Sequence, residues 1–303
     1  MIRYPISEAE LRQKISEEDP KWLDDAAKRT AAFDSAGYYD EKLEFDSGGK
    51  TVKASPIWSR IKPVFMRLQY EKCAYCERQL SSEEWGRGEH DLEHFRPKSK
   101  ARPWKASASL LREGVALTPA LDGKYDAGYH LFSYHPLNYC ASCKTCNSGL
   151  KSDIFPIAGV RDSMGSNPRK MGDEKALLIY PLGSIDTDPE TLIDFHGLSP
   201  RAIPTGSFGR HRALSSISFF QLKNPKRKEL YRERARQIVA VHSFLLNRAT
   251  AGDVWDGLIA IYQDSSAPHS SCTRSFVRLF ESDRTEADEI FRLAADYLKS
   301  VSS

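Results

Sequence analysis

Cys73-Ala-Tyr-Cys76 and Cys143-Lys-Thr-Cys146 are the two stretches that decide the fold of this chain. Each has the C-x-x-C spacing that allows two thiolates of one turn to bind the same metal ion, and four thiolates complete a tetrahedral zinc site. Because the two pairs lie far apart in the sequence, a shared ion would join distant segments, and its binding would be coupled to folding. The sequence therefore predicts a structural Zn²⁺ bound by all four cysteines.

The remaining two cysteines leave one alternative open. Cys140 extends the second pair, so that Cys140, Cys143 and Cys146 have the spacing C-x-x-C-x-x-C. Together with the distant pair they could hold an iron–sulfur cluster. We favour zinc, because a cluster would leave the neighbouring Asn147 without a role. Cys140 and Cys272 are expected to be free, partly buried thiols rather than disulfide partners.

Size and composition indicate an ordinary globular protein. The 303 residues are 40% hydrophobic and 28% charged. The net charge of +3 is too small to indicate nucleic-acid binding, which would have to depend on local patches. No apolar run approaches the roughly 20 residues that a membrane helix requires. The first ten residues contain no apolar signal core, so we expect a cytoplasmic protein that does not enter a membrane.

Turn and helix signals divide the chain into three parts, and the expected fold class is α+β, mainly helical. Residues 1–70 should form helices that deliver the chain to the first cysteine pair. Residues 71–158 should form the metal-binding core, with a partly looped insertion at 97–130. Residues 159–303 should begin with loops and a few strands and end in amphipathic helices. These last helices are expected near 226–247, 251–263, 271–282 and 285–300.

Local signals set the expected ends of the N-terminal helices. Ser7 and Glu10 have the spacing of a capping box. Asp19-Pro20 has the pattern of a cap followed by proline at the first helical position. Gly37 should end the second helix. Pro63 lies inside the next expected helix and should kink it.

An acidic residue followed directly by a histidine, Glu93-His94, lies between the cysteine pairs, and we call it the acid–histidine step. It belongs to the stretch Asp91-Leu-Glu93-His94-Phe-Arg96-Pro-Lys98. Asn138 precedes the second pair, and Asn147 directly follows it. A neutral imidazole can accept a proton from water near pH 7. A divalent cation held by oxygen ligands can stabilise the charge that develops during phosphate displacement. A histidine with these neighbours therefore indicates phosphodiester hydrolysis, whereas the other histidines are interpreted as ordinary surface or core residues.

A competing motif overlaps this step. His90-Asp-Leu-Glu93-His94 has the H-x-x-E-H pattern of inverted zinc peptidases. That chemistry requires a helix, so that both histidines share one face. Gly86, Gly88 and Pro97 leave room for barely two turns, and the motif would leave four cysteines unexplained. We therefore reject the peptidase interpretation.

The core residues resemble the HNH nuclease family, in the subgroup whose ββα-metal fold carries a zinc knuckle. The resemblance implies that His94 is the general base and that Glu93 and Asn147 bind one catalytic Mg²⁺ or Mn²⁺. It implies that Asn138 orients the hairpin and the imidazole. A regular strand would place Glu93 and His94 on opposite faces, so both can serve one site only if the strand twists or ends there. The implied architecture is an HNH core with structural zinc, embedded between N-terminal helices and a C-terminal helical region.

Charged neighbours of the step have expected roles as well. We expect Arg96, Lys98 and Lys151 to contact phosphate oxygens of a nucleic acid. Asp91 either supports the metal ligands from behind or is simply solvated. The stretch from Lys223 to Arg236 could follow a nucleic-acid backbone, but a solvated helix face is the favoured interpretation.

Several longer sequence segments resemble the HNH subunits of the Septu and retron anti-phage systems. Residues 72–77 (KCAYCE), 93–98 (EHFRPK) and 155–156 (FP) match in the core. The resemblance spans roughly residues 57–250, although the insertion at 97–130 is longer than the family's usual connection. It implies a prokaryotic defence effector and an ATPase partner that controls the nuclease.

These observations lead to three functional hypotheses. The first is a metal-dependent endonuclease that cuts DNA and leaves 5′-phosphate and 3′-hydroxyl ends. The second is an RNA or tRNA nuclease with the same site, because such a site grips phosphates rather than bases. The third is a non-catalytic zinc module that binds nucleic acid or a partner protein.

Overall fold

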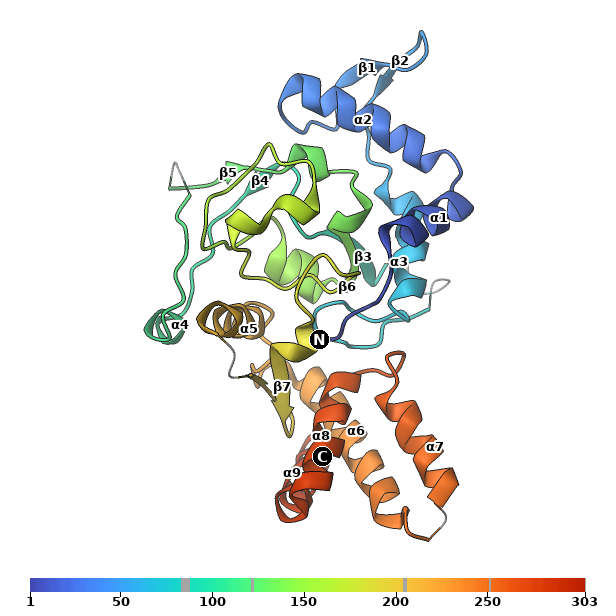
Figure 1. Ribbon diagram of the computed structural model, residues 1–303, viewed down its shortest axis with the longest axis vertical. Helices are drawn as coiled ribbons and strands as arrows, with labels where there is room; N and C mark the ends of the chain where they lie inside the picture. The colour runs from blue at the N-terminus through green and yellow to red at the C-terminus, as the bar shows by residue number, and fades with distance from the viewer. Residues whose placement is uncertain (83–87, 121–122, 204–205, 251, 303) are drawn as a thin grey trace.

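The computed structural model describes residues 1–82, 88–120, 123–203, 206–250 and 252–302. Figure 1 shows a mixed part formed by the first two thirds of the chain and, below it, the C-terminal helices. The strands form small two-stranded antiparallel sheets. This mixture of helices and small sheets agrees with the expected α+β class.

The first helices begin and end largely where the local signals predict. α1 (Glu8–Glu18) starts with a capping box, in which Ser7 and Glu10 bond each other's backbone. α2 (Trp22–Ala36) ends at Gly37, whose φ of 77° is one that glycine adopts without strain. The prediction that Pro20 is the first residue of α2 was wrong, because Asp19 ends α1 instead and α2 begins two residues after the proline.

A short hairpin and a third helix carry the chain to the first cysteine pair. The hairpin consists of β1 (Glu44–Asp46) and β2 (Thr51–Lys53). A 3₁₀ turn at Trp58–Ile61 then leads into α3 (Lys62–Leu68). The predicted kink at Pro63 was wrong, because the helix begins one residue earlier, and proline in a first turn removes no helical hydrogen bond.

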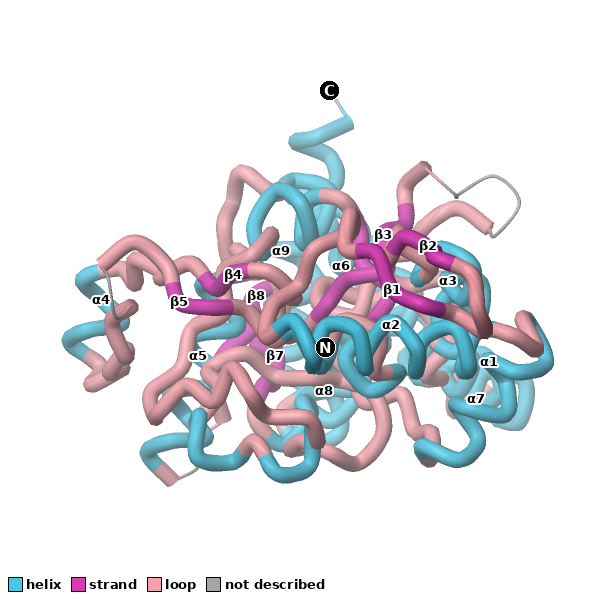
Figure 2. Tube along the Cα trace, turned by 90° about the horizontal axis from the view of Figure 1, so that it is seen from above, coloured by secondary structure: helices cyan, strands magenta, loops and turns pink. Residues whose placement is uncertain are grey.

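The centre of the fold is a strand pair followed by a helix. β3 (His90–His94) pairs antiparallel with β6 (Tyr139–Cys143), and Glu93 lies opposite Cys140 in the register. α3 packs against both strands, and Figure 2 shows it beside β3. A π-helix at Thr145–Lys151 continues from β6. The second cysteine pair therefore straddles the junction between strand and helix.

The insertion between β3 and β6 is only partly looped. It contains β4 (Lys100–Ala101), α4 (Ala108–Arg112) and β5 (Asp126–Ala127), and β4 pairs with β5. These elements lie to one side of the central strand pair (Figure 1).

Residues beyond the core contain an element that the sequence interpretation missed. After β7 (Ile193–His196) and β8 (Ser199–Ala202) comes α5 (Ser207–Phe219), in a region expected to hold loops and strands. Its glycine and serines have low helix propensity, which hid it. Ser215 and Ser216 are fully buried, so α5 is stabilised by close packing rather than by its local sequence.

The C-terminal helices confirm the predicted pattern. They are α6 (Lys228–Asn247), α7 (Gly252–Gln263), α8 (Ser270–Ser282) and α9 (Arg284–Ser302). These helices pack around a separate hydrophobic cluster, which includes Ile238, Phe276 and Ile290. The main cluster contains the four cysteines of the C-x-x-C pairs together with Trp22 and Phe65. None of the described helices is long and apolar enough to cross a membrane.

Candidate metal centres and the adjoining cleft

The four cysteines of the C-x-x-C pairs meet in the structure, as predicted. Their sulfur atoms all lie within 4.8 Å of one another, and all four residues are buried. The Sγ atoms of Cys76 and Cys143 are 3.9 Å apart. A tetrahedral zinc ion with Zn–S bonds of about 2.3 Å requires sulfur atoms about 3.8 Å apart. The cluster can therefore hold a metal ion such as zinc without rearrangement of the chain.

Cys140 and Cys272 stand apart from this cluster, as expected of free thiols, but both are fully buried rather than partly buried as predicted. Cys140 donates to the hydroxyl of Tyr75 at 3.3 Å, and burial raises the pKa of its thiol to about 12. Burial likewise raises the pKa of Cys272 to about 12. The geometry does not support an iron–sulfur cluster that includes Cys140, because its side chain bonds a tyrosine.

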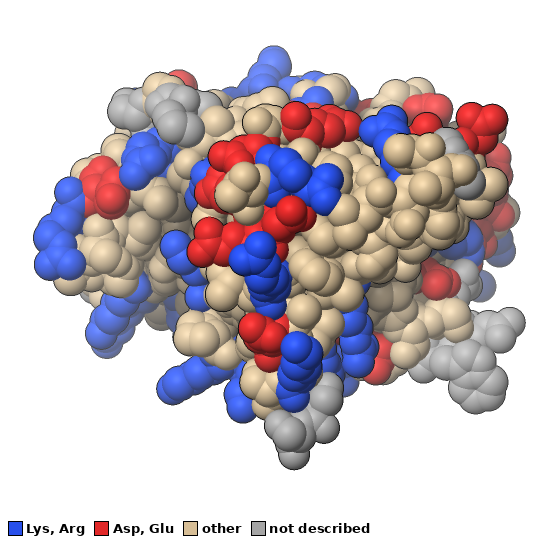
Figure 3. All heavy atoms as spheres, turned by 90° about the horizontal axis from the view of Figure 1, so that it is seen from below, with Lys and Arg blue, Asp and Glu red and all other residues tan. Residues whose placement is uncertain are grey.

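Arg227 contacts the cysteine cluster, and sequence reasoning did not single it out. Its Nη1 lies 3.6 Å from Cys146 Sγ and donates to Phe220 O at 2.8 Å. The guanidinium is buried, so its positive charge balances part of the negative charge of a thiolate site. Arg227 and the equally buried Arg234 belong to the stretch that was considered for backbone binding. These two arginines do not face solvent, and basic and acidic side chains lie interspersed on the face formed by the C-terminal helices (Figure 3).

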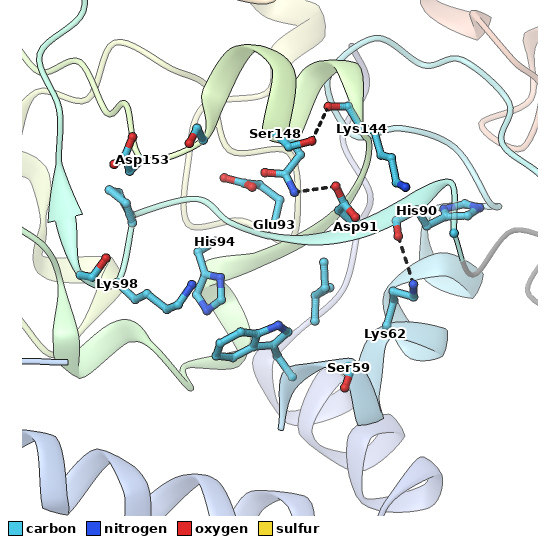
Figure 4. Close-up of a pocket in the computed structure, with 17 residues that line it drawn as sticks. Ser59, Lys62, His90, Asp91, Glu93, His94, Lys98, Lys144, Ser148 and Asp153 are labelled. Carbon is cyan, nitrogen blue, oxygen red and sulfur yellow. Dashed lines mark hydrogen bonds between the residues drawn. The ribbon is translucent and has the colours of Figure 1, made fainter. Parts of the chain in front are cut away.

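A cavity of about 600 Å³ runs along β3 beside the cysteine cluster (Figure 4). Among the described residues, β3 pairs with β6 alone, so its other edge is open to this cavity. Because side chains alternate along a strand, both faces of β3 contribute to the wall. The charged and polar lining residues are Ser59, Lys62, His90, Asp91, Glu93, His94, Lys98, Ser99, Lys144, Asn147, Ser148, Ser152 and Asp153.

His94 lines the cavity at the end of β3. Its ring meets the rings of Trp58 and Tyr139 edge-on, each with centroids 4.9 Å away. Its Nε2 is 3.1 Å from Ser133 O, and a carbonyl can only accept, so Nε2 carries the proton and Nδ1 keeps its lone pair. Burial, followed by the charge of Lys98, holds the pKa of His94 well below its usual value. The imidazole is thus neutral at pH 7 and able to accept a proton at Nδ1.

Glu93 lies on the opposite face of β3 from His94, as Figure 4 shows, but β3 ends at His94 and both residues line the cavity. The Nζ atom of Lys151 is 2.5 Å from Glu93 Oε1 and donates to His94 O at 2.8 Å. Burial raises the pKa of Glu93 above its usual value, while the ammonium of Lys151 opposes this rise. Lys151 is fully buried. The prediction that it contacts phosphates was therefore wrong: it holds the end of β3 against the π-helix.

Asn147 and Asp91 face each other across the same part of the cleft. The amide Nδ2 of Asn147 donates to Asp91 Oδ2 at 3.0 Å. Both residues are partly buried and line the cavity. Asp91 shares its strand face with Glu93, so three oxygen-bearing side chains gather between β3 and the π-helix.

Asn138 joins the segment that follows β3 to the segment that precedes β6, at one end of the strand pair. Its Oδ1 accepts the N–H of Arg96 at 2.8 Å, and its Nδ2 donates to Arg96 O at 3.0 Å and to Phe132 O at 3.1 Å. Phe132 directly precedes Ser133, whose carbonyl bonds the His94 ring. Asn138 thus fixes the backbone around the imidazole without touching it, in line with its expected orienting role.

The two basic residues after His94 have different surroundings. The side chain of Arg96 is buried, and its Nε donates to Glu174 at 2.8 Å, so the prediction that it contacts phosphates was wrong. Lys98 does line the cleft, where its Nζ lies 4.6 Å from the centroid of the Trp58 ring. Burial lowers the pKa of Lys98.

The peptidase pattern has no structural support. His90 and His94 lie on a strand rather than a helix, so their Cα atoms are about 13 Å apart. His90 Nε2 bonds Ser81 O at 2.7 Å instead of turning toward His94.

Residues from distant segments complete the cleft, and sequence reasoning missed them. Trp58 and Lys62 come from the turn before α3 and from α3 itself, and Lys62 Nζ donates to His90 O at 3.0 Å. No local motif marks either residue.

The chain matches no family model, no curated protein and no solved structure.

Acidic and basic groups both line the cleft. The carboxylate of Glu93 is paired with the buried Lys151, whereas that of Asp91 accepts from Asn147. Lys62, Lys98 and Lys144 line the same cavity from three different segments. The arrangement combines a proton acceptor, oxygen donors for a hard cation and ammonium groups for phosphate oxygens.

Proposed function

We propose that this chain is a metal-dependent endonuclease of the HNH type that hydrolyses phosphodiester bonds of DNA. One observation carries the proposal: His94, Asn147 and the carboxylates of β3 line a single cleft beside a four-cysteine cluster. The strand pair β3–β6 followed by the π-helix has the order of a ββα core. The cysteine cluster would bind structural Zn²⁺ and fix the junction of β6 with that helix.

The residues present fit a divalent cation. The amide oxygen of Asn147 and the carboxylate of Glu93 are the hard donors that Mg²⁺ or Mn²⁺ prefers, and both residues line the cleft. Such an ion, when bound, would stabilise the charge on the departing 3′-oxygen. Lys151 pairs with the buried Glu93 and opposes the rise in the pKa of its carboxyl, which favours the ionised form that a carboxylate ligand requires.

His94 would act as the general base. Its Nδ1 makes no hydrogen bond within the described part of the chain, while Nε2–H is bound to Ser133 O. It would take one proton from a water molecule as the water oxygen bonds to phosphorus and the P–O3′ bond breaks. The departing 3′-oxyanion would take a proton from solvent, so that the products are a 5′-phosphate and a 3′-hydroxyl. Ser133 would stabilise the imidazolium formed in this step, because its carbonyl already accepts from the same ring.

The lysines of the cleft are the groups that would contact the nucleic acid. Lys62, Lys98 and Lys144 would hold phosphate oxygens, which DNA and RNA share. DNA is the proposed substrate by resemblance to the HNH family, and RNA or tRNA is the second candidate. A zinc module that only binds nucleic acid or a partner protein would have no need of the free Nδ1 on His94.

The cellular role is also proposed by resemblance. The chain is similar in its core phrases to HNH subunits of anti-phage systems, so we propose a cytoplasmic defence effector that works with an ATPase partner. Co-purification of the chain with the product of an adjacent ATPase gene would test this role.

A nuclease assay with two variants tests the enzymatic proposal. Wild type, His94→Ala and the surface variant His196→Ala are incubated with plasmid DNA and with total RNA, with Mg²⁺, Mn²⁺ or neither. We expect cleavage by the wild type and His196→Ala only when a divalent cation is present, and none by His94→Ala. Zinc content should be equal in all three. Full activity of His94→Ala would remove the assigned base, and binding without cleavage under every condition would favour the zinc module.

A further inference from the structure

The hydrogen bond between Asn147 and Asp91 also determines which end of the Asn147 amide faces Asp91. A side-chain amide has a donor end and an acceptor end, which differ by a half-turn of the last torsion. A carboxylate accepts only, so the amide can meet Asp91 in one sense alone, with Nδ2 toward Oδ2 at 3.0 Å. Its oxygen then points away from Asp91. Without Asp91, either end of the amide could face the cleft.

The amide oxygen is the atom that matters for a hard cation. Mg²⁺ and Mn²⁺ bind carbonyl and carboxylate oxygens, whereas an NH₂ group presents its positive end to them. Asn147 lines the cleft and follows directly on the cysteine cluster, so its backbone is held in place. The remaining freedom is the flip of the amide, which Asp91 removes.

We propose that Asp91 is a positioning residue that orients the Asn147 amide so that its oxygen faces the divalent cation. This inference rests on the proposed function and deepens it, because it assigns a role to a residue left unassigned there. The carboxylate of Glu93 does not play this part, because the ammonium of Lys151 holds its Oε1 at 2.5 Å. Asp91 instead acts on the cation through Asn147, as carboxylates behind metal-binding histidines do.

Removal of Asp91 should weaken cation binding. The probe is Mn²⁺ alone, titrated into zinc-loaded protein and followed by electron paramagnetic resonance. For Asp91→Ala we expect an affinity about tenfold or more below the wild type. Asp91→Asn should fall between the two, because its amide can accept from Asn147 but can also donate to it, so the orientation is no longer unique. Asp296→Ala, on the exposed surface of α9, should bind like the wild type.

A double variant separates orientation from direct ligation. In Asn147→Asp the side chain presents an oxygen in either orientation, so no orienting partner is needed. Asp91→Ala in that background should therefore leave Mn²⁺ affinity unchanged or raise it, since two facing carboxylates repel. If Asp91 were itself a ligand, its removal would weaken binding in both backgrounds.

The binding assay tests the role of Asp91, and the cleavage assay tests the proposed function. Unchanged Mn²⁺ affinity in Asp91→Ala, or a protein that binds no Mn²⁺, overturns the inference whatever the nuclease assay gives. The expected pattern of affinities without cleavage of DNA or RNA would overturn the proposed function and leave the role of Asp91 intact. In an active protein, the Mn²⁺ concentration for half-maximal cleavage should shift with the measured affinity.

Discussion

Lys151→Met is the substitution whose effect on stability follows most directly from the structure. The side chain of Lys151 is fully buried, and its ammonium contacts Glu93 Oε1 at 2.5 Å and His94 O at 2.8 Å. Methionine has a similar length and shape, so the change removes the charge and little volume. It leaves the buried carboxylate of Glu93 without its cation. Breaking a buried pair in this way costs about 3–5 kcal/mol of unfolding free energy.

A double-mutant cycle isolates that cost. Glu93→Gln/Lys151→Met contains no buried charge at this position, so we expect it to lose less than about 2 kcal/mol. Lys299→Met, which removes an exposed cation paired with Asp296, should change stability by no more than about 0.5 kcal/mol. The measurement is urea unfolding of the zinc-loaded proteins at pH 7, followed by tryptophan fluorescence. A loss below about 1 kcal/mol in Lys151→Met, or a double variant less stable than the single one, would refute the reasoning.

Three further predictions follow from the metal centre, a buried histidine and the proposed base. Cys73→Ser should lose zinc and unfold the core, while Cys272→Ser should keep its zinc; elemental analysis with circular dichroism distinguishes them. His135 accepts the N–H of Leu137 at Nδ1, and burial lowers its pKa to about 4, so the folded state holds the neutral ring. The unfolded chain takes up this proton below about pH 6.5, so the contribution of His135 to stability is present above that pH and is lost as the pH falls toward 4. Between pH 7 and pH 5 the wild type should lose about 2 kcal/mol of unfolding free energy through this residue. His135→Asn keeps an acceptor but does not titrate, so it should lose correspondingly less. Urea unfolding at the two pH values measures both. His94→Ala should lower the cleavage rate by about 10²–10⁴. It should also lower the melting temperature, because the buried ring packs against Trp58 and Tyr139. The rate is therefore compared per amount of folded protein, and a rate loss explained by loss of folded protein alone would speak against a catalytic role.

The parts of the fold that could be predicted are those with a strong local signal. The spacing of the cysteine pairs anticipated the cluster, and apolar periodicity anticipated α6 to α9. α5 carries serine and glycine and was missed, because tertiary packing around Ser215 and Ser216 overrides its weak propensity. Pro63 was misjudged because one residue decides whether proline begins a helix or interrupts it.

The candidate site was predictable in its chemistry but not in its surroundings. The sequence shows that Arg96, Lys98 and Lys151 are basic, but not that two of them are buried against Glu174 and Glu93. Burial depends on which distant segments pack together. The same limit applies to Ser133, a small residue whose backbone carbonyl sets the tautomer of His94 and which no side-chain pattern could mark.

The contact between Arg227 and Cys146 has a mechanical consequence. Arg227 stands at the start of α6, and Cys146 is joined by one peptide bond to Asn147. A displacement of α6 would therefore be transmitted through this contact to Asn147, which lines the cleft. The shape of the cleft is thus coupled to the position of helices that do not line it.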